Sequence, residues 1–120
     1  MMKMDEQRKI LLVEDHKGVR EMLTEVLDSN GWRVLSAADA PKALEIAKET
    51  HNLAALLTDM NLGEAKGEYV AQEVLKYSPG IHVVYMSTDT REELGSRLPP
   101  DARFWCKRFV NLEELEALLR

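Results

Sequence analysis

Short runs of consecutive apolar residues alternate along this chain with longer segments whose apolar positions recur every three or four residues. The runs lie within residues 9–13, 32–36, 53–58, 81–86 and 102–106, and those at 32–36, 81–86 and 102–106 are interrupted by one or two polar residues. Unbroken apolar character over about five residues is typical of a strand that is buried on both faces. The segments between the runs have helical spacing at 17–30, after Asp39, at 69–77 and after Asn111. The pattern therefore predicts strands alternating with helices.

The ends of the predicted helices carry recognisable signals. Asn30 and Gly31 stop the first helix, and Asp39 opens the second. Asn111, with Glu114 three residues later, resembles a capping box at the start of the last helix. A further helix over 90–97 is short, because a glycine interrupts it and two prolines follow it. The predicted order is a strand followed by a helix, repeated five times.

This alternation predicts an α/β fold with a doubly wound, five-stranded parallel sheet of the flavodoxin-like type and helices on both faces. In such open sheets, ligands bind beyond the carboxyl ends of the strands, where the strand order reverses. The residues that follow each strand are therefore the first candidates for a functional site.

Composition limits the class of protein. A chain of 120 residues that is 45% hydrophobic can form one core, so we expect a single domain over residues 1–120. A formal charge of −5 argues against direct nucleic-acid binding, and the sequence contains no apolar stretch long enough to insert into a membrane. One cysteine cannot form an internal disulfide, and no signal peptide is evident at the start. We expect a cytoplasmic location.

Chemically active side chains follow four of the five strands. They are Glu14 and Asp15 after the first strand, Asp59 after the third, Ser87 and Thr88 after the fourth and Lys107 after the fifth. Carboxylates brought to one edge repel one another unless a cation lies among them. Carboxylate and carbonyl oxygens suit Mg²⁺, or Mn²⁺ as a substitute, which leaves other coordination positions to water and a phosphoryl group.

Each of these residues also has a plain structural interpretation. Asp59 alone is a common type of turn residue, and Glu14 with Asp15 could simply favour the start of a helix. Lys107 could be a solvated charge at a strand end. The three histidines lack metal-ligand spacing, and the common nucleotide-binding motifs are absent. The functional interpretation depends on the coincidence of all four strand ends.

Four stretches together resemble the receiver domain of bacterial two-component response regulators. They are ILLVEDHKGVREML, LLTDMNLGEAKG, VVYMST and FWCKRF, in the order expected for that family. The resemblance implies that Asp59 is the phosphoacceptor, that Asp15 holds Mg²⁺ directly and that Glu14 holds it through water. It also implies a magnesium contact from the backbone carbonyl of Asn61, and contacts from Ser87 and Lys107 to the phosphoryl group.

The resemblance further implies a switch. Ser87 would move toward the phosphoryl group and Phe104, at the aromatic switch position, would turn inward. The signal would appear on a face formed by the fourth helix, fifth strand and fifth helix, through which receivers can form homodimers. The implied partner is a histidine kinase or a histidine phosphotransfer domain, and the domain would catalyse its own phosphorylation and dephosphorylation.

Several residues depart from the common pattern of the family. Gly63 and Arg108 stand where prolines are usual, and Arg108 adds a second cation beside the site. Thr88 replaces a smaller residue and, with Asp89, lies where it can modulate access to the site. The stretch LPPDARFWCKRF also looks like receivers at the end of hybrid sensor histidine kinases.

Two alternatives remain open at this point. One is a pseudo-receiver, a protein-interaction module of the same fold that does not signal by phosphorylation. The other is a magnesium-dependent aspartyl phosphohydrolase. Such enzymes usually carry a second Asp two residues after the nucleophile, where this chain has Asn61.

Overall fold

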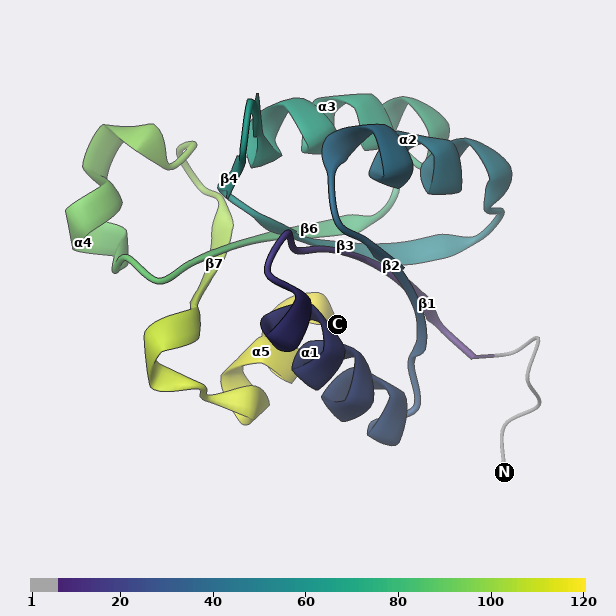
Figure 1. Cartoon of the computed structure of the whole chain (residues 1–120), viewed down its shortest axis with the longest axis horizontal. Coiled ribbons are helices and arrows are strands. Elements are labelled where there is room, and N and C mark those ends of the chain that lie inside the picture. Colours follow the sequence, from purple (N-terminus) through teal and green to yellow (C-terminus); the bar gives the residue numbers. More distant parts are fainter. Residues whose placement is uncertain (1–6) are drawn as a thin grey trace.

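The computed structural model describes residues 7–120 and has a central parallel sheet (Figure 1). Within these residues, five strands form the main sheet in the order β2-β1-β3-β6-β7. They are β1 (Lys9–Val13), β2 (Arg33–Ala37), β3 (Leu53–Asp59), β6 (His82–Ser87) and β7 (Arg103–Cys106). All neighbouring pairs are parallel. The strand order reverses between β1 and β3, which confirms the doubly wound, flavodoxin-like prediction.

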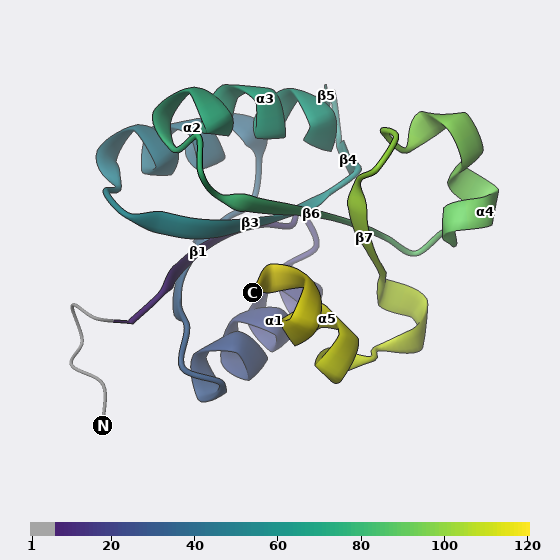
Figure 2. The same cartoon turned by 180° about the vertical axis from the view of Figure 1, so that it is seen from behind.

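Helices cover both faces of this sheet. The structure contains α1 (Lys17–Ser29), α2 (Ala40–Glu49), α3 (Gly67–Tyr77), α4 (Arg91–Leu94) and α5 (Leu112–Leu119). Figures 1 and 2 show α2 and α3 on one face, α1 and α5 on the other, and α4 beyond the β7 edge. The uneven placement leaves α4 with the fewest neighbours to pack against.

The alternation of side chains along β1 explains why its apolar run is unbroken. Ile10 and Leu12 lie in the core cluster that includes Leu23 of α1 and Leu115 of α5. Leu11 and its neighbour Val13 lie in the cluster that α2 and α3 complete. Both faces of the strand are therefore dry, and each large aliphatic side chain buried in this way contributes roughly 1.5–3 kcal/mol.

Most predicted boundaries agree with the structure to within two residues, and β1 agrees in full. The Asp39 and Asn111 side chains cap α2 and α5, as predicted. The complete capping box lies elsewhere, at Thr90 and Glu93 of α4. The first helix is capped by His16, whose Nδ1 accepts the Val19 N–H.

Two short features, a hairpin and a 3₁₀ turn, were not predicted, and the predicted helix over 90–97 is shorter than expected. A two-stranded hairpin, β4 (Asn61–Leu62) with β5 (Ala65–Lys66), lies between β3 and α3. The predicted helix over 90–97 is a single turn, α4, that continues as the 3₁₀ turn η2 (Gly95–Arg97). A second 3₁₀ turn, η3 (Lys107–Phe109), follows β7. All three features follow the carboxyl ends of strands, at the end of the sheet where Asp59 lies.

Among residues 7–120, no helix is both long enough and apolar enough to cross a bilayer.

Candidate functional site

The pairing of β1 with β3 brings two carboxylates together at the carboxyl edge of the sheet. Val13 lies opposite Thr58, so Glu14 and Asp59 are the next residues at that edge. The Glu14 N–H donates to the Ala37 carbonyl at 3.1 Å, which extends the sheet by one residue. Glu14 is 1% exposed and Asp59 5% exposed. Two acids this deeply buried require a compensating charge.

Lys107 supplies that charge from the end of β7, which lies two strands away from β3 in the sheet. It is the first residue of η3, and its Nζ lies 2.8 Å from Glu14 Oε1 and 2.6 Å from Asp59 Oδ1. The Lys107 side chain is only 16% exposed. One ammonium group is therefore shared between two buried carboxyl groups, which confirms that the ends of β1, β3 and β7 meet.

The pKa values of Asp59 and Glu14 are shifted in opposite directions. Burial, reinforced by the adjacent Glu14 carboxylate, raises the pKa of Asp59 to about 8, although Lys107 acts in the opposite direction. Burial also acts to raise the pKa of Glu14, but hydrogen bonds involving Asp59, Lys107 and the His16 N–H outweigh it and lower that pKa to about 2. Asp59 is thus the carboxyl group that would gain most from a further positive charge.

Asp15 completes a group of acids that fits a divalent cation. One oxygen from each of Glu14, Asp15 and Asp59 lies within 4.8 Å of the others. Asp15 is exposed, so the cluster opens to solvent on its side. Hard oxygen donors with access to water match the preferences of Mg²⁺, which keeps several waters when it binds to proteins. The acidic cluster is suited to Mg²⁺.

Gly67 packs against the backbone of the loop after Asp59, and it was not among the site residues predicted from the sequence. It is the first residue of α3 and its N–H donates to the Met60 carbonyl at 2.8 Å. A Cβ atom at this position would collide with the carbonyl oxygen of Asp59. The only signal in the sequence is a glycine that begins a helix without an evident turn, which is too common to identify a functional role.

The residues predicted to act as a switch lie on the other side of Asp59. Ser87 ends β6, which pairs with β3 so that Met86 lies opposite Asp59. The Ser87 Oγ accepts the Asp89 N–H at 3.0 Å. Thr88 is exposed, whereas Phe104 of β7 is 8% exposed and has the Arg91 guanidinium over its ring at 5.7 Å. The Phe104 ring already lies in the core in this structure.

Arg108, expected as a second cation beside the site, bonds the segment that follows β6 and does not contact the three clustered acids. Its Nε donates to the Thr88 carbonyl at 3.0 Å, and its Nη2 lies 2.9 Å from Glu93 Oε1. Asn61, the predicted donor of a backbone carbonyl, is the exposed first residue of β4.

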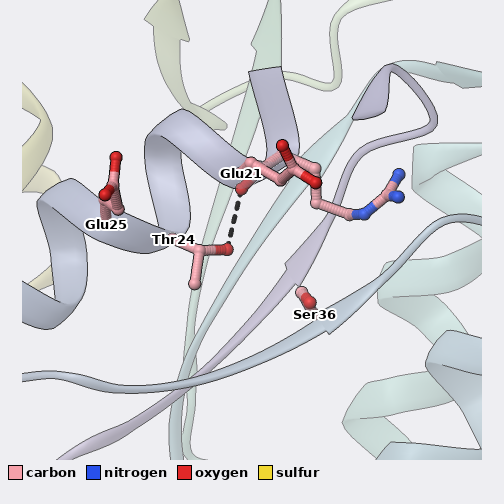
Figure 3. Close-up of a pocket in the computed structure, with 5 residues that line it drawn as sticks. Glu21, Thr24, Glu25 and Ser36 are labelled. Carbon is pink, nitrogen blue, oxygen red and sulfur yellow. Dashed lines mark hydrogen bonds between the residues drawn. The ribbon is translucent and has the colours of Figure 1, made fainter. Parts of the chain in front are cut away.

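A separate groove of about 550 Å³ lies between α1 and β2 (Figure 3). Its lining residues are Arg20, Glu21, Thr24, Glu25 and Ser36. Figure 3 shows Glu21 and Thr24 on the helix and Ser36 on the neighbouring strand. Arg20 connects the groove with the acidic cluster, because its Nη1 donates to the Glu14 carbonyl at 2.8 Å. The groove itself includes none of the three clustered acids.

The family model for the response regulator receiver domain matches residues 10–99. This chain belongs to that family. The matched span contains Glu14, Asp15, Asp59 and Ser87. Lys107 follows the span, so its place in the site comes from the two ion pairs in the structure.

Individual relatives agree with the family assignment. The chain is 35% identical over 118 residues to the probable transcriptional regulator ycf27 of Porphyridium aerugineum, covering 96% of the chain and 48% of that protein. It is 32% identical over 96 residues to the sensor kinase CckA of Brucella abortus, covering 79% of the chain and 10% of that kinase. The chain thus spans only about half, or a tenth, of the length of these relatives.

The fold is also found in solved structures. One is the receiver domain of the sensor histidine kinase PA1611 from Pseudomonas aeruginosa PAO1, which has a magnesium ion coordinated in its active-site cleft. The TM-score is 0.75 at 23% identity, and the match covers 93% of this chain and 94% of the other. At this identity the likeness supports the receiver fold alone.

Proposed function

We propose that this receiver domain accepts a phosphoryl group on Asp59 from a phosphohistidine. The observation that supports the proposal best is the position of Asp59, which is buried at the sheet edge, 2.6 Å from Lys107 and beside Glu14 and Asp15. A structural turn residue would not need a buried ammonium group or two neighbouring acids. The same arrangement suits a nucleophile that must carry additional negative charge after it reacts.

The transfer step is a displacement at phosphorus. A carboxylate oxygen of Asp59 attacks the phosphorus atom, the P–N bond to the histidine ring breaks, and its electron pair stays on the ring nitrogen, which then takes a proton. Lys107 holds the Asp59 carboxylate in place and neutralises charge on the phosphoryl oxygens. Little covalent chemistry is asked of the protein, so positioning and electrostatics supply most of the catalysis.

Asp15 and Asp59 would hold a Mg²⁺ or Mn²⁺ ion directly, with Glu14 acting through water and Asn61 through its backbone carbonyl. When bound, the ion supplies positive charge to the transferring phosphoryl oxygens. The fit rests on the cluster of three acids and on the raised pKa of Asp59, whose ionised form a second cation would stabilise. Water reaching the same site would later hydrolyse the acyl phosphate and reset the domain.

After transfer, the Ser87 hydroxyl would bond a phosphoryl oxygen and leave the Asp89 N–H that it now accepts. Phe104, whose ring already lies in the core, would pack against the space that Ser87 leaves, and Thr88 with Asp89 would limit the access of water and phosphodonors. The altered surface would be the face of α4, β7 and α5, which could bind a partner or a second copy of the chain. The donor would be a histidine kinase or a histidine phosphotransfer domain in the cytoplasm, and the receiver could be one part of a hybrid kinase.

The decisive experiment is incubation with Mg²⁺ and acetyl phosphate, followed by intact-mass measurement. A gain of one phosphoryl group that disappears in Asp59→Asn and on chelation of the metal is expected. An unmodified wild-type chain would favour a pseudo-receiver instead. Steady turnover of external phosphate esters would point to a phosphohydrolase. Asp28→Asn, which changes an exposed acid of α1, is a matched control that should be phosphorylated like the wild type.

A further inference from the structure

Arg108 and Lys107 are adjacent in η3 but their side chains serve different partners. Lys107 bonds the two buried carboxylates, whereas Arg108 bonds the Thr88 carbonyl through Nε at 3.0 Å and Glu93 Oε1 through Nη2 at 2.9 Å. The short turn thus contacts two places at once. Lys107 contacts the acidic cluster, and Arg108 contacts the segment between β6 and α4.

Both partners of Arg108 belong to one small hydrogen-bonded unit. Thr88 immediately follows Ser87, whose hydroxyl accepts the Asp89 N–H at 3.0 Å. Glu93 Oε1 also accepts the Thr90 N–H, and the Thr90 hydroxyl accepts the Glu93 N–H. Arg108 holds one end of this stretch through the Thr88 backbone carbonyl and the other end through the Glu93 carboxylate, so a shift of residues 88–93 toward Asp59 would break both bonds.

The side chain matters more here because α4 itself is weakly anchored. It comprises one turn, Arg91–Leu94, and one of its residues is buried. A guanidinium group can donate to a carbonyl and to a carboxylate at once from its planar set of N–H groups, whereas a lysine offers a single ammonium and a proline offers no donor. Arg108 is therefore one of the few side chains that hold this segment, together with Arg91, which donates to the Ala102 carbonyl at 2.9 Å.

We propose that Arg108 is a positioning residue that clamps residues 88–93 in the arrangement in which the Ser87 hydroxyl is bonded to Asp89. This inference rests on the proposed phosphorylation of Asp59. Because the clamp opposes the movement of Ser87 toward a phosphoryl group, it makes the arrangement of the phosphorylated domain less favourable. The domain therefore binds a phosphoryl mimic more weakly than it would without the clamp. A bond that is present in one arrangement and absent in the other shifts the equilibrium between them.

The test compares the binding of beryllofluoride, a phosphoryl mimic, in excess Mg²⁺ to the wild type, Arg108→Ala and Glu93→Gln. Arg108→Ala should bind about three- to tenfold more tightly, as expected for loss of an exposed ion pair and a charged hydrogen bond. Glu93→Gln should fall between the two, and the double variant should match Arg108→Ala. Affinity for Mg²⁺ alone should stay within about twofold, since Arg108 contacts none of the clustered acids.

Arg120→Ala is the matched control, because Arg120 is also exposed and also bonds a carboxylate, that of Glu116 at 2.9 Å, and a carbonyl, that of Asn30 at 3.4 Å. It should leave beryllofluoride affinity unchanged. If Arg108→Ala does not fold, Arg108→Lys should give a smaller gain in affinity of the same sign. If both Arg108 variants bind beryllofluoride as tightly as the wild type or more weakly, the clamp is overturned but the phosphorylation of Asp59 is not. If the wild type does not bind beryllofluoride, both the clamp and the phosphorylation of Asp59 are overturned.

Discussion

The two sides of Asp59 are built in different ways. On one side, β1 and β3 are buried on both faces, and Glu14, Asp59 and Lys107 form ion pairs of 2.8 and 2.6 Å in the interior. On the other side, Ser87 leads into the exposed Thr88 and the one-turn helix α4, held by the surface side chain of Arg108. The first side is held by buried ion pairs and dense packing, and the second by hydrogen bonds between partly or fully exposed groups.

The difference corresponds to two physical requirements. A nucleophile and its ammonium partner react well only if their geometry is fixed before the donor arrives. A segment that reports the reaction must have a second arrangement within a few kcal/mol of the first. Densely packed strands satisfy the first requirement, and a short helix tied by exposed hydrogen bonds satisfies the second.

The largest loss of stability is expected at Gly67, which packs against the backbone of Asp59. Gly67→Ala should destabilise the protein by about 2–4 kcal/mol, because the new Cβ would overlap the Asp59 carbonyl, which belongs to the backbone and cannot turn away. Gly80→Ala is the control, since a Cβ there meets nothing within 4 Å. Urea unfolding of both variants measures the difference, and equal midpoints would show that the loop after Asp59 is not rigid.

Removal of the shared ammonium should have the next largest effect. Lys107→Met should cost about 1–3 kcal/mol at pH 7, because the ionised Glu14 and the buried Asp59 carboxyl group lose the ammonium that they share. Lys42→Met, which breaks an exposed pair with Glu45, should cost less than about 0.5 kcal/mol. A Lys107 variant as stable as this control would contradict the importance of the buried pairs.

The pH dependence of that loss follows from Glu14. The pKa of Glu14 is lowered from an ordinary value of 4.5 to about 2, so its ionised form stabilises the fold above 4.5, and this contribution is lost as the pH falls toward 2. In metal-free buffer, the difference between wild type and Lys107→Met should therefore shrink over this interval. Denaturant midpoints at several pH values measure it, and a constant difference would exclude this origin.

Metal binding should stabilise the wild type by about 1.4 kcal/mol when Mg²⁺ is at ten times its dissociation constant. Asp59→Asn should lose most of this gain, because it removes the carboxylate from the centre of the cluster of three acids. Thermal melts with and without Mg²⁺, with Asp28→Asn as control, measure the effect. The same stabilisation in Asp59→Asn would place the ion elsewhere.

The smallest loss of stability is expected at Ser87, on the side of Asp59 that leads into α4. Ser87→Ala should cost less than about 1 kcal/mol, because the bond that it removes joins the Ser87 hydroxyl to the N–H of Asp89 at a partly exposed position. Asp59 should still be phosphorylated in this variant, as followed by intact mass. A loss as large as that for Lys107→Met would mean that the two sides are restrained alike.

The difference between the two sides of Asp59 also explains which parts of the structure could be predicted from the sequence. The strands that carry Glu14 and Asp59 were recognisable because burial on both faces leaves unbroken apolar runs, as in LAALLTD. The meeting of these acids with Lys107 followed from the topology of parallel sheets. Elements with many restraints leave repeated signals in the sequence.

The parts that were missed leave weaker signals. The strands β4 and β5 have two residues each, which is too short for a period. The role of Gly67 depends on a contact with Asp59 that spacing does not reveal. The direction of the Arg108 side chain depends on the position of Thr88 across the edge of the sheet. Such tertiary contacts between exposed or single residues have no periodic pattern.

The most direct test of the contrast is amide hydrogen exchange with and without Mg²⁺ and beryllofluoride, in the wild type and in Asp59→Asn. In the wild type, exchange should change mainly in residues 87–110, around α4 and η3, while the core residues of β1 and β3 stay protected throughout. Asp59→Asn should show no such change. Equal changes in β1, β3 and α4, or the same response in Asp59→Asn, would contradict a fixed reactive side coupled to a movable reporting side.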